Sequence, residues 1–441
     1  MPVKAFSLLL IHFLVIFGYS ISSGLYRLQG FFILIFALAI FGLLFFRENL
    51  FVQFKSSENL DNLFVFSAIL SLVFSLSFYA GLYQAKGFLY NFSLFLFFVG
   101  LCLSAFYLWP KVKQTYLPRR VNLFYCFLGL ALLLRLFMLL SSPNPTIDVF
   151  DILKLAPQKL IQGENPYQAN YTKMFVDVAT DRFAYPPGAF LATLPAVVLF
   201  GDPRLTNVIA EILSALILYV ILKKKFGPNS IIAETLPVIF LFSPRALLVC
   251  EQAWLEPTIL CLLLLSYFLS QHQHKVITLI IFGFLITIKQ TLIFLPILLW
   301  RSLKLDLKKL GLIAFGALAV LLPFFLWSPA DFYYDTITSY FSTVTQMREL
   351  INQSLTFGGF LFNTFKIEYP SFLSFLVTVP ILGCILKKQG RGWSQFFLAT
   401  TLFYFALFLF STQAFLNFYY FIGQLILVNI ALLPKEKEPE I

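Results

Sequence analysis

The chain has 441 residues, of which 59% are hydrophobic and 12% are charged, and Phe alone occurs 56 times. A soluble domain is about 45–50% apolar and about 25% charged, so this composition excludes a soluble enzyme, a secreted disulfide scaffold and a disordered protein. We therefore expect an all-α, polytopic integral membrane protein whose helices satisfy their own backbone hydrogen bonds in lipid.

The net charge of +11 does not predict a nucleic-acid partner, because Lys and Arg gather in short connections between apolar runs, as they do in cytoplasmic loops. The five cysteines lie scattered in apolar runs without a CxxC pair, and their expected role is that of small buried side chains. His272 and His274 lie in a short basic connection, which predicts a solvated loop rather than a metal site. We expect neither a metal ion nor another cofactor.

A membrane helix needs about 20 mainly apolar residues. The apolar runs of that kind are 5–24, 28–46, 63–84, 88–109, 121–141, 187–201, 206–222, 230–244, 254–270, 276–300, 310–327, 369–386, 393–411 and 413–433. They predict about 12–14 transmembrane or re-entrant helices. We expect a leading four-helix region at 1–120 with a retained first span, a transmembrane core at 121–433 and a short charged tail at 434–441.

Orientation follows from the basic residues, which favour cytoplasmic connections. Four basic clusters lie between the apolar runs: Lys111 to Arg120, Lys223 to Lys225, Arg301 to Lys309, and Lys387 to Arg391. With all four inside, an outer loop at 142–188 and a second one at about 328–355 face outward. Run 187–201 must then enter and leave the membrane on the same side or be half of a broken helix, and run 276–300 is expected to be a pair of short helices that enter and leave on the same side. Irregular backbone at that depth is tolerated only beside protein or a watery cavity, so both runs indicate a cavity.

The outer loop begins with a segment of helical periodicity. Its apolar side chains fall on one side and its polar ones on the other, which predicts an amphipathic helix lying on the outer membrane surface. Thr146 is the predicted N-cap and Gly163 the predicted stop. Asp148 then lies at the membrane face, where its carboxylate can act as a general base toward an attacking hydroxyl. Its alternative role is to stabilise the positive end of the helix, and spacing alone favours that alternative.

Three motifs of this loop resemble the first outer loop of the GT-C glycosyltransferases: DVFD at 148–151, GENPY at 163–167 and YPP at 185–187. GT-C enzymes are polytopic and use a polyprenyl-phosphate-linked sugar, and the closest likeness is to the family 87 and glycosylphosphatidylinositol mannosyltransferases. The layout is similar over roughly 121–430, whereas the motifs match well only over 145–225. The four leading spans and the Asp148-x-x-Asp151 pair depart from the family pattern. Asp148 fits the spacing to Tyr167 better, and Asp151 remains its rival.

The resemblance implies an integral membrane hexosyltransferase with a GT-C-like fold. It would move a hexose, expected to be mannose, from a polyprenyl-phosphate donor to a lipid or glycan acceptor on the outer face. Transfer would invert the sugar, with Asp148 or Asp151 as the general base. The donor carries no nucleotide diphosphate, so a metal-free reaction is expected. The short connections favour a bacterial plasma membrane over an internal eukaryotic membrane.

The resemblance also implies cations that bind the donor phosphate. A charge inside a span costs about 2.5–3.5 kcal/mol on insertion scales and usually faces an interior or a cavity. The candidates are Arg135, Arg245 and Lys289. Lys289 lies deepest in its apolar run and matches the family pattern, and its alternative role is an ion pair with Glu234 or Glu211.

Six further residues lie in segments that resemble substrate-contacting parts of the family. They are Tyr167, Tyr185, Glu251, Glu256, Asn352 and Gln353. The alternative role of the two tyrosines, equally favoured, is to anchor the protein at the membrane–water interface. The two glutamates suit ion pairs with Arg245, and the two amides suit solvated loop positions.

Two other classes of membrane protein share this composition. A lipid or solute transporter, including a flippase, also has broken helices and intramembrane charges, but it would show matching broken segments in two halves, which we do not find. A structural membrane protein or a polysaccharide polymerase or ligase is the third class. Polymerases and ligases carry Arg, Glu or His in a late outer loop, and 328–355 has Arg348 as its one base and no His. The sequence therefore favours the glycosyltransferase.

Overall fold

The computed structural model describes residues 2–47, 60–79, 81–107, 123–171, 182–227, 230–338 and 351–433. Within these ranges the chain is helical, and its one β contact is an isolated bridge between Leu25 and Ser354. The all-α prediction is therefore confirmed for the described residues. The predicted tail at 434–441 and the basic cluster from Lys111 to Arg120 lie outside them.

Among the described residues, six helices are long and apolar enough to cross a membrane. They are α2 (Leu28–Phe46), α4 (Phe88–Tyr107), α6 (Leu123–Ser141), α9 (Arg204–Phe226), α15 (Leu307–Trp327) and α20 (Ser371–Lys388). Large apolar side chains such as Phe36, Phe95 and Leu318 are exposed on them, as side chains facing lipid are. The chain is a polytopic membrane protein, as its composition predicts.

Shorter apolar helices complete the bundle. They are α1 (Pro2–Ser20), α3 (Leu60–Ser77), α10 (Ile231–Leu241), α12 (Glu256–Gln271), α13 (Lys275–Leu285), α14 (Leu295–Leu303), α21 (Trp393–Leu409) and α22 (Leu416–Leu432). Almost every residue of α21 and α22 is buried, so the last two helices form the centre of the bundle. The leading helices pack directly on the rest of the chain, with α1 against α22, α2 against α21 and α3 against α10.

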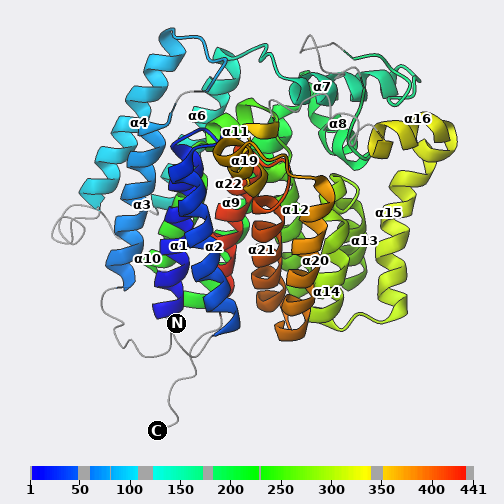
Figure 1. Ribbon diagram of the computed structural model, residues 1–441. Helices are drawn as coiled ribbons and strands as arrows, with labels where there is room; N and C mark the ends of the chain where they lie inside the picture. The colour runs from blue at the N-terminus through cyan, green and yellow to red at the C-terminus, as the bar shows by residue number, and fades with distance from the viewer. Residues whose placement is uncertain are drawn as a thin grey trace.

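The two ends of the bundle differ in the segments that they carry (Figure 1). One end, here called the basic end, gathers the described basic clusters. There Lys225 Nζ donates to the Ala431 carbonyl at 2.8 Å, and Arg301 Nε donates to the Leu386 carbonyl at 2.9 Å. The opposite end, here called the loop end, carries α7 (Asp148–Ile161), α8 (Gly188–Phe200), α11 (Ala246–Glu251), α16 (Pro329–Tyr333) and α19 (Phe357–Phe365). The described basic clusters and the outer loops thus lie at opposite ends, as the orientation argument requires.

Of the two stretches expected to turn back, run 276–300 forms a hairpin, whereas run 187–201 forms one short helix. Helix α8 has 13 residues and packs beneath α7 at the loop end, where the Thr193 hydroxyl donates to the Leu153 carbonyl at 3.2 Å (Figure 1). Run 276–300 divides into α13, the short 3₁₀ helix η2 (Gln290–Phe294) and α14, and both arms of this hairpin reach the basic end. Lys289 therefore lies at the turn of the hairpin, directly before η2.

Helix α7 is amphipathic, with Val149, Ile152 and Leu153 buried and its polar side chains more open. The stop at Gly163 is confirmed, because this glycine has a φ of +79° just beyond the helix. The N-cap prediction was wrong. Ile147, not Thr146, precedes the helix in an extended conformation, and no side chain caps that end. Thr146 instead offers its backbone carbonyl to the Tyr83 hydroxyl, at 2.6 Å.

Candidate functional site

Asp148 is the first residue of α7 and is only partly exposed. Its Oδ1 accepts a hydrogen bond from the Val149 N–H at 2.8 Å, a contact that holds the carboxylate at the positive end of the helix. Burial raises the pKa of Asp148 above its ordinary value, and the nearby charge of Asp151 raises it further, although the Val149 N–H opposes both. A carboxyl with a raised pKa is a stronger base once it has lost its proton.

Asp151 follows one turn later on the same helix. In the described part of the chain, no hydrogen-bond partner reaches its buried Oδ2. A buried carboxylate oxygen without a partner is costly, and such atoms are candidates for a ligand or a bound water. Asp148 and Asp151 thus both remain candidates for the general base.

Tyr185 links α7 to the rest of the site. Burial raises the pKa of its phenol, and the charges of Asp148 and Glu256 raise that pKa further. The two carboxylates lie more than a hundred residues apart along the chain. The sequence motifs alone do not bring Glu256 to the first outer loop.

Lys289 forms an ion pair with Glu256, with 2.7 Å between Nζ and Oε1. The same Oε1 accepts from Asn417 Nδ2 at 2.8 Å, and the Lys289 ammonium lies 4.2 Å from the centre of the Phe418 ring. Glu256 is 3% exposed, and within the described residues its Oε2 has no hydrogen-bond partner. The expected alternative partners, Glu234 and Glu211, are replaced by Glu256.

Backbone contacts hold the two halves of this site together. The Gly188 N–H donates to the Thr287 carbonyl at 3.0 Å, and Gln290 Nε2 donates to the Ala184 carbonyl at 2.6 Å. A Cβ at residue 188 would lie 2.3 Å from Thr287 Oγ1, so only glycine allows this approach. These contacts place the segment before α8 against the turn that carries Lys289.

We call Asp148, Asp151, Tyr185, Glu256 and Lys289 the loop-end site. It combines a carboxylate that can accept a proton, an ammonium that can pair with a phosphate oxygen and a hydroxyl near the carboxylates. Among the residues that the structure describes, no group of three or more His, Cys, Asp and Glu side chains could hold a metal ion. The chemistry that these side chains support is proton removal beside an anionic leaving group.

Tyr167 lies next to this site as a packing residue. It is 4% exposed, and its ring contacts Phe183, Phe190, Phe324 and Phe332. Its hydroxyl donates to the Tyr185 carbonyl at 2.9 Å. Tyr167 therefore fixes the backbone of Tyr185, while its own ring is enclosed among aromatic side chains.

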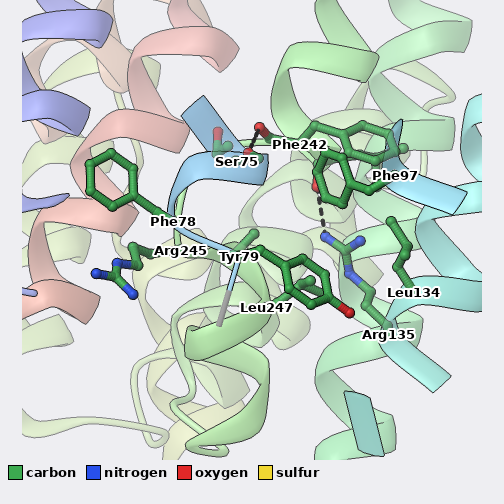
Figure 2. Close-up of a pocket in the computed structure, with 12 residues that line it drawn as sticks. Ser75, Phe78, Tyr79, Phe97, Leu134, Arg135, Phe242, Arg245 and Leu247 are labelled. Carbon is green, nitrogen blue, oxygen red and sulfur yellow. Dashed lines mark hydrogen bonds between the residues drawn. The ribbon is translucent and has the colours of Figure 1, made fainter. Parts of the chain in front are cut away.

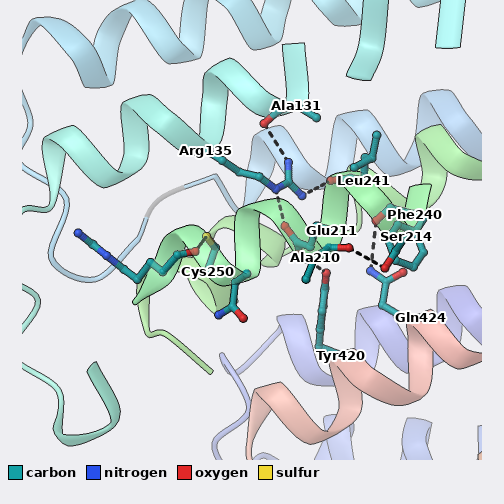
Figure 3. A network of polar contacts seen from close by, with 12 residues as sticks. Ala131, Arg135, Ala210, Glu211, Ser214, Phe240, Leu241, Cys250, Tyr420 and Gln424 are labelled. Carbon is teal, nitrogen blue, oxygen red and sulfur yellow. Dashed lines mark hydrogen bonds and ion pairs between the residues drawn. The ribbon is translucent and has the colours of Figure 1, made fainter. Parts of the chain in front are cut away.

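Arg135 lies apart from the loop-end site. It is 1% exposed and ion-paired with Glu211, and its other nitrogens donate to the Leu241 carbonyl at 2.8 Å and the Ala131 carbonyl at 3.1 Å. Glu211 in turn accepts from the Tyr420 hydroxyl at 2.6 Å (Figure 3). Because protein groups occupy every nitrogen of the guanidinium, the structure gives Arg135 an internal role rather than access to a phosphate.

Arg245 lines a small hollow with Arg135, Ser75 and Tyr79 (Figure 2). The space inside is about 10 Å³, close to the least that holds one water molecule. Arg245 Nη2 donates to the Ser23 hydroxyl at 2.9 Å, and its guanidinium lies 5.1 Å from the centre of the Phe78 ring. In Figure 2 the Arg245 head group points away from Arg135, so the two arginines do not converge on one ligand.

Glu251 is fully buried at the end of α11 and contacts the loop between α3 and α4. Its Oε2 accepts from the Leu82 N–H at 2.6 Å, and its Oε1 accepts from the Tyr83 N–H at 3.1 Å. Glu251 thus binds backbone donors, a role that the sequence did not suggest.

Asn352 and Gln353 use their backbone carbonyls for internal contacts. The Asn352 carbonyl accepts from Asn363 Nδ2 at 2.7 Å, and the Gln353 carbonyl accepts from the Tyr26 N–H at 2.6 Å. The Gln353 side chain is exposed. These residues join the loop between α1 and α2 to α19, and the structure does not bring them to Lys289.

Sequence reasoning missed two polar residues near the loop-end site, Asn417 and Tyr83. Asn417 directly precedes Phe418, Tyr419 and Tyr420 near the start of the last apolar run, 413–433, so a polar residue at that place could have pointed to it. Tyr83 lies in a leading loop that no motif marks.

Searches of protein-family models, curated proteins and solved structures find no match for this chain.

Proposed function

We propose that this protein is an integral membrane glycosyltransferase of GT-C-like architecture. It moves a hexose, most simply mannose, from a polyprenyl-phosphate donor to a lipid or glycan acceptor on the extracytoplasmic face of a bacterial plasma membrane. The observation that carries the proposal is the buried Lys289–Glu256 pair, whose turn bonds to the segment of Tyr185 through Gln290 Nε2 and the Ala184 carbonyl at 2.6 Å, at the end of the bundle where α7 carries Asp148.

The position of α7 supports a substrate that lies at the membrane boundary. Its buried face packs on α8 at the loop end, and Asp148 is the first residue of the helix. A polyprenyl-phosphate sugar keeps its tail in lipid and its phosphate at the headgroup level. Its sugar would then lie at the level of a surface helix, whereas a soluble sugar nucleotide has no need of such a site.

The reaction follows from the side chains present. Asp148 accepts the proton of an acceptor hydroxyl as that oxygen forms a bond to the anomeric carbon of the donor. The bond between that carbon and the phosphate oxygen breaks, and the electron pair leaves with the polyprenyl phosphate. Attack from the face opposite the phosphate inverts the anomeric centre. Lys289, which keeps two N–H donors beyond its bond to Glu256, stabilises the charge on the departing phosphate.

Purified protein incubated with labelled polyprenyl-phosphate sugars and a native lipid extract tests the proposal. Labelled product that depends on the protein supports transfer, and NMR of the new linkage reports the stereochemistry. A lipid or solute transporter is the competing function, since buried pairs such as Arg135–Glu211 also suit a transport pathway. If the protein moves labelled lipid between leaflets and forms no labelled product, the glycosyltransferase proposal is rejected in favour of a transporter.

A further inference from the structure

The loop between α3 and α4 is held at the loop end by one buried carboxylate. Glu251 accepts the N–H groups of Leu82 and Tyr83 at 2.6 Å and 3.1 Å, and Gln252 Nε2 donates to its Oε2 at 3.2 Å. Charge-assisted hydrogen bonds to a carboxylate are stronger than neutral ones, and the Glu251 side chain is fully buried. We call this arrangement the Glu251 latch.

The Glu251 latch leaves no room for a side chain at Gly81. A Cβ at this position would lie 2.4 Å from Oε1 and 2.5 Å from Cδ of Glu251. The carboxylate is the part that would yield most easily, and its displacement would release the two N–H groups that it holds. Gly87, at the other end of the same loop, has no atom within 4 Å of such a Cβ. Gly87→Ala is therefore the sterically free control for Gly81→Ala.

The latched loop carries Tyr83 to the start of α7. The Tyr83 hydroxyl donates to the Thr146 carbonyl at 2.6 Å, two residues before Asp148. Burial raises the pKa of Tyr83, and the charges of Glu251 and Asp148 raise it further. The same loop bonds to the end of α6, where the Ala85 N–H donates to the Ser141 carbonyl at 2.7 Å.

We infer that the leading helices supply a positioning residue to the loop-end site: Tyr83, held by the Glu251 latch, fixes the Thr146 carbonyl and thereby the orientation of the Asp148 carboxylate. This inference rests on the proposed function for its kinetic consequence. The leading region is then a working part of the site rather than an appended membrane anchor. Glu251 acts on the loop and not on the sugar.

Hydrogen–deuterium exchange of the purified full chain in lipid nanodiscs tests the latch without any substrate. Leu82 and Tyr83 amides should exchange slowly in the wild type and in Gly87→Ala, and at least tenfold faster in Gly81→Ala. Tyr83→Phe should speed exchange over 147–151 at the start of α7, whereas Tyr90→Phe, the same change on α4, should not. Fast exchange at Leu82 and Tyr83 in the wild type would overturn the latch, and unchanged exchange at 147–151 would overturn the role of Tyr83.

Kinetics of sugar transfer test the effect on Asp148. Tyr83→Phe should lower kcat by roughly 10- to 100-fold, as misplacement of a catalytic group does, with the donor KM within about twofold of wild type. The acid limb of the pH profile should move to lower pH, because a loosened α7 lets water reach Asp148 and lowers its pKa. Wild-type kcat and pH profile in Tyr83→Phe would overturn the inference. A wild-type protein without transfer activity would refute the proposed function alone, since the exchange measurements decide the latch independently.

Discussion

The Lys289–Glu256 pair shows how one site can hold opposite charges in a membrane protein. Glu256 is 3% exposed and is compensated on Oε1 by Lys289 and Asn417. Breaking a buried pair by removal of one partner costs about 3–5 kcal/mol, because the remaining charge has no compensation. Replacing Lys289 with Met therefore keeps the protein stable only if Glu256 is made neutral as well. Such a double variant separates the structural role of Lys289 from its role in binding a phosphate.

Asp148→Asn should lower sugar transfer by at least about a hundredfold, because an amide cannot accept the proton of the acceptor hydroxyl. Expression and donor binding should stay close to wild type, since Asn keeps the shape and the hydrogen bond from the Val149 N–H. Single-turnover assays with labelled donor measure the effect. Asp151→Asn is the matched variant, and full activity in Asp148→Asn with loss in Asp151→Asn would assign the base to Asp151.

The acid limb of the pH profile of transfer should reflect the raised pKa of Asp148. The base works only when ionised, so kcat/KM should rise with pH through that pKa and level off above it. Because burial and Asp151 raise the pKa, the midpoint should lie above about 4, the ordinary value of an Asp side chain. A pH series of initial rates locates it. The limb should be absent in the residual activity of Asp148→Asn, and its persistence there would show that another group titrates.

Lys289→Met should raise the donor KM by about tenfold or more, because a charge-assisted hydrogen bond to the phosphate is lost. It should also lower stability, since Glu256 is left buried without its cation. The double variant Lys289→Met/Glu256→Gln should recover the thermal stability but not the donor affinity. Equal donor affinity in wild type and double variant would reduce Lys289 to a structural partner of Glu256.

At the scale of elements, hydrophobic patterning predicted most of the long helices, although run 63–84 extends seven residues beyond the end of α3 at Ser77 and run 276–300 divides into α13, η2 and α14. Run 28–46 coincides with α2, and 393–411 exceeds α21 by two residues at its end. The pattern missed α11, α16 and α19, which are short and lie within connections. Their length is set by tertiary contacts such as the Glu251 latch rather than by a periodic face, so no local pattern marks them.

The hairpin that carries Lys289 depends on a close approach of α13 and α15. A Cβ at Gly283 would lie 2.3 Å from the Ile313 carbonyl oxygen and 2.9 Å from the Ala317 nitrogen. Both are backbone atoms, so the helices themselves would have to separate. Close packing through small residues is a common means of helix association in lipid.

Gly283→Val should therefore destabilise the protein by about 1–3 kcal/mol, as overpacking of a filled interface does. Thermal unfolding in detergent measures the loss. Gly311→Ala on α15 is the control, because a Cβ there meets no atom within 4 Å and Ala favours the helix. A wild-type melting temperature in Gly283→Val would show that α13 and α15 can part without cost, and that the turn at Lys289 is held by other contacts.

At the scale of the whole molecule, the sequence separated the leading spans from the core, and the structure packs them together. α1 lies against α22, the helices at the two ends of the described chain, and α3 lies against α10. The Lys289–Glu256 pair and the bond from Gln290 to the Ala184 carbonyl also join segments far apart in sequence. Such contacts arise from the complementary shapes of apolar faces, and those faces look alike in a chain that is 59% hydrophobic. The candidate site residues could be predicted from the chemistry of their side chains, but the residues that contact them in the fold could not be predicted from the sequence.

The orientation of the bundle in the membrane can be tested on single cysteines. Glu164, just after α7 at the loop end, and Lys308, at the basic end, are both exposed. In a background in which the five native cysteines are replaced by Ser or Ala, a membrane-impermeant thiol reagent should label Glu164→Cys in intact cells. It should label Lys308→Cys only after permeabilisation, since basic connections stay on the cytoplasmic side. The reverse pattern would place Asp148 on the cytoplasmic face, where a sugar nucleotide is at hand and a polyprenyl-phosphate donor would confer no advantage.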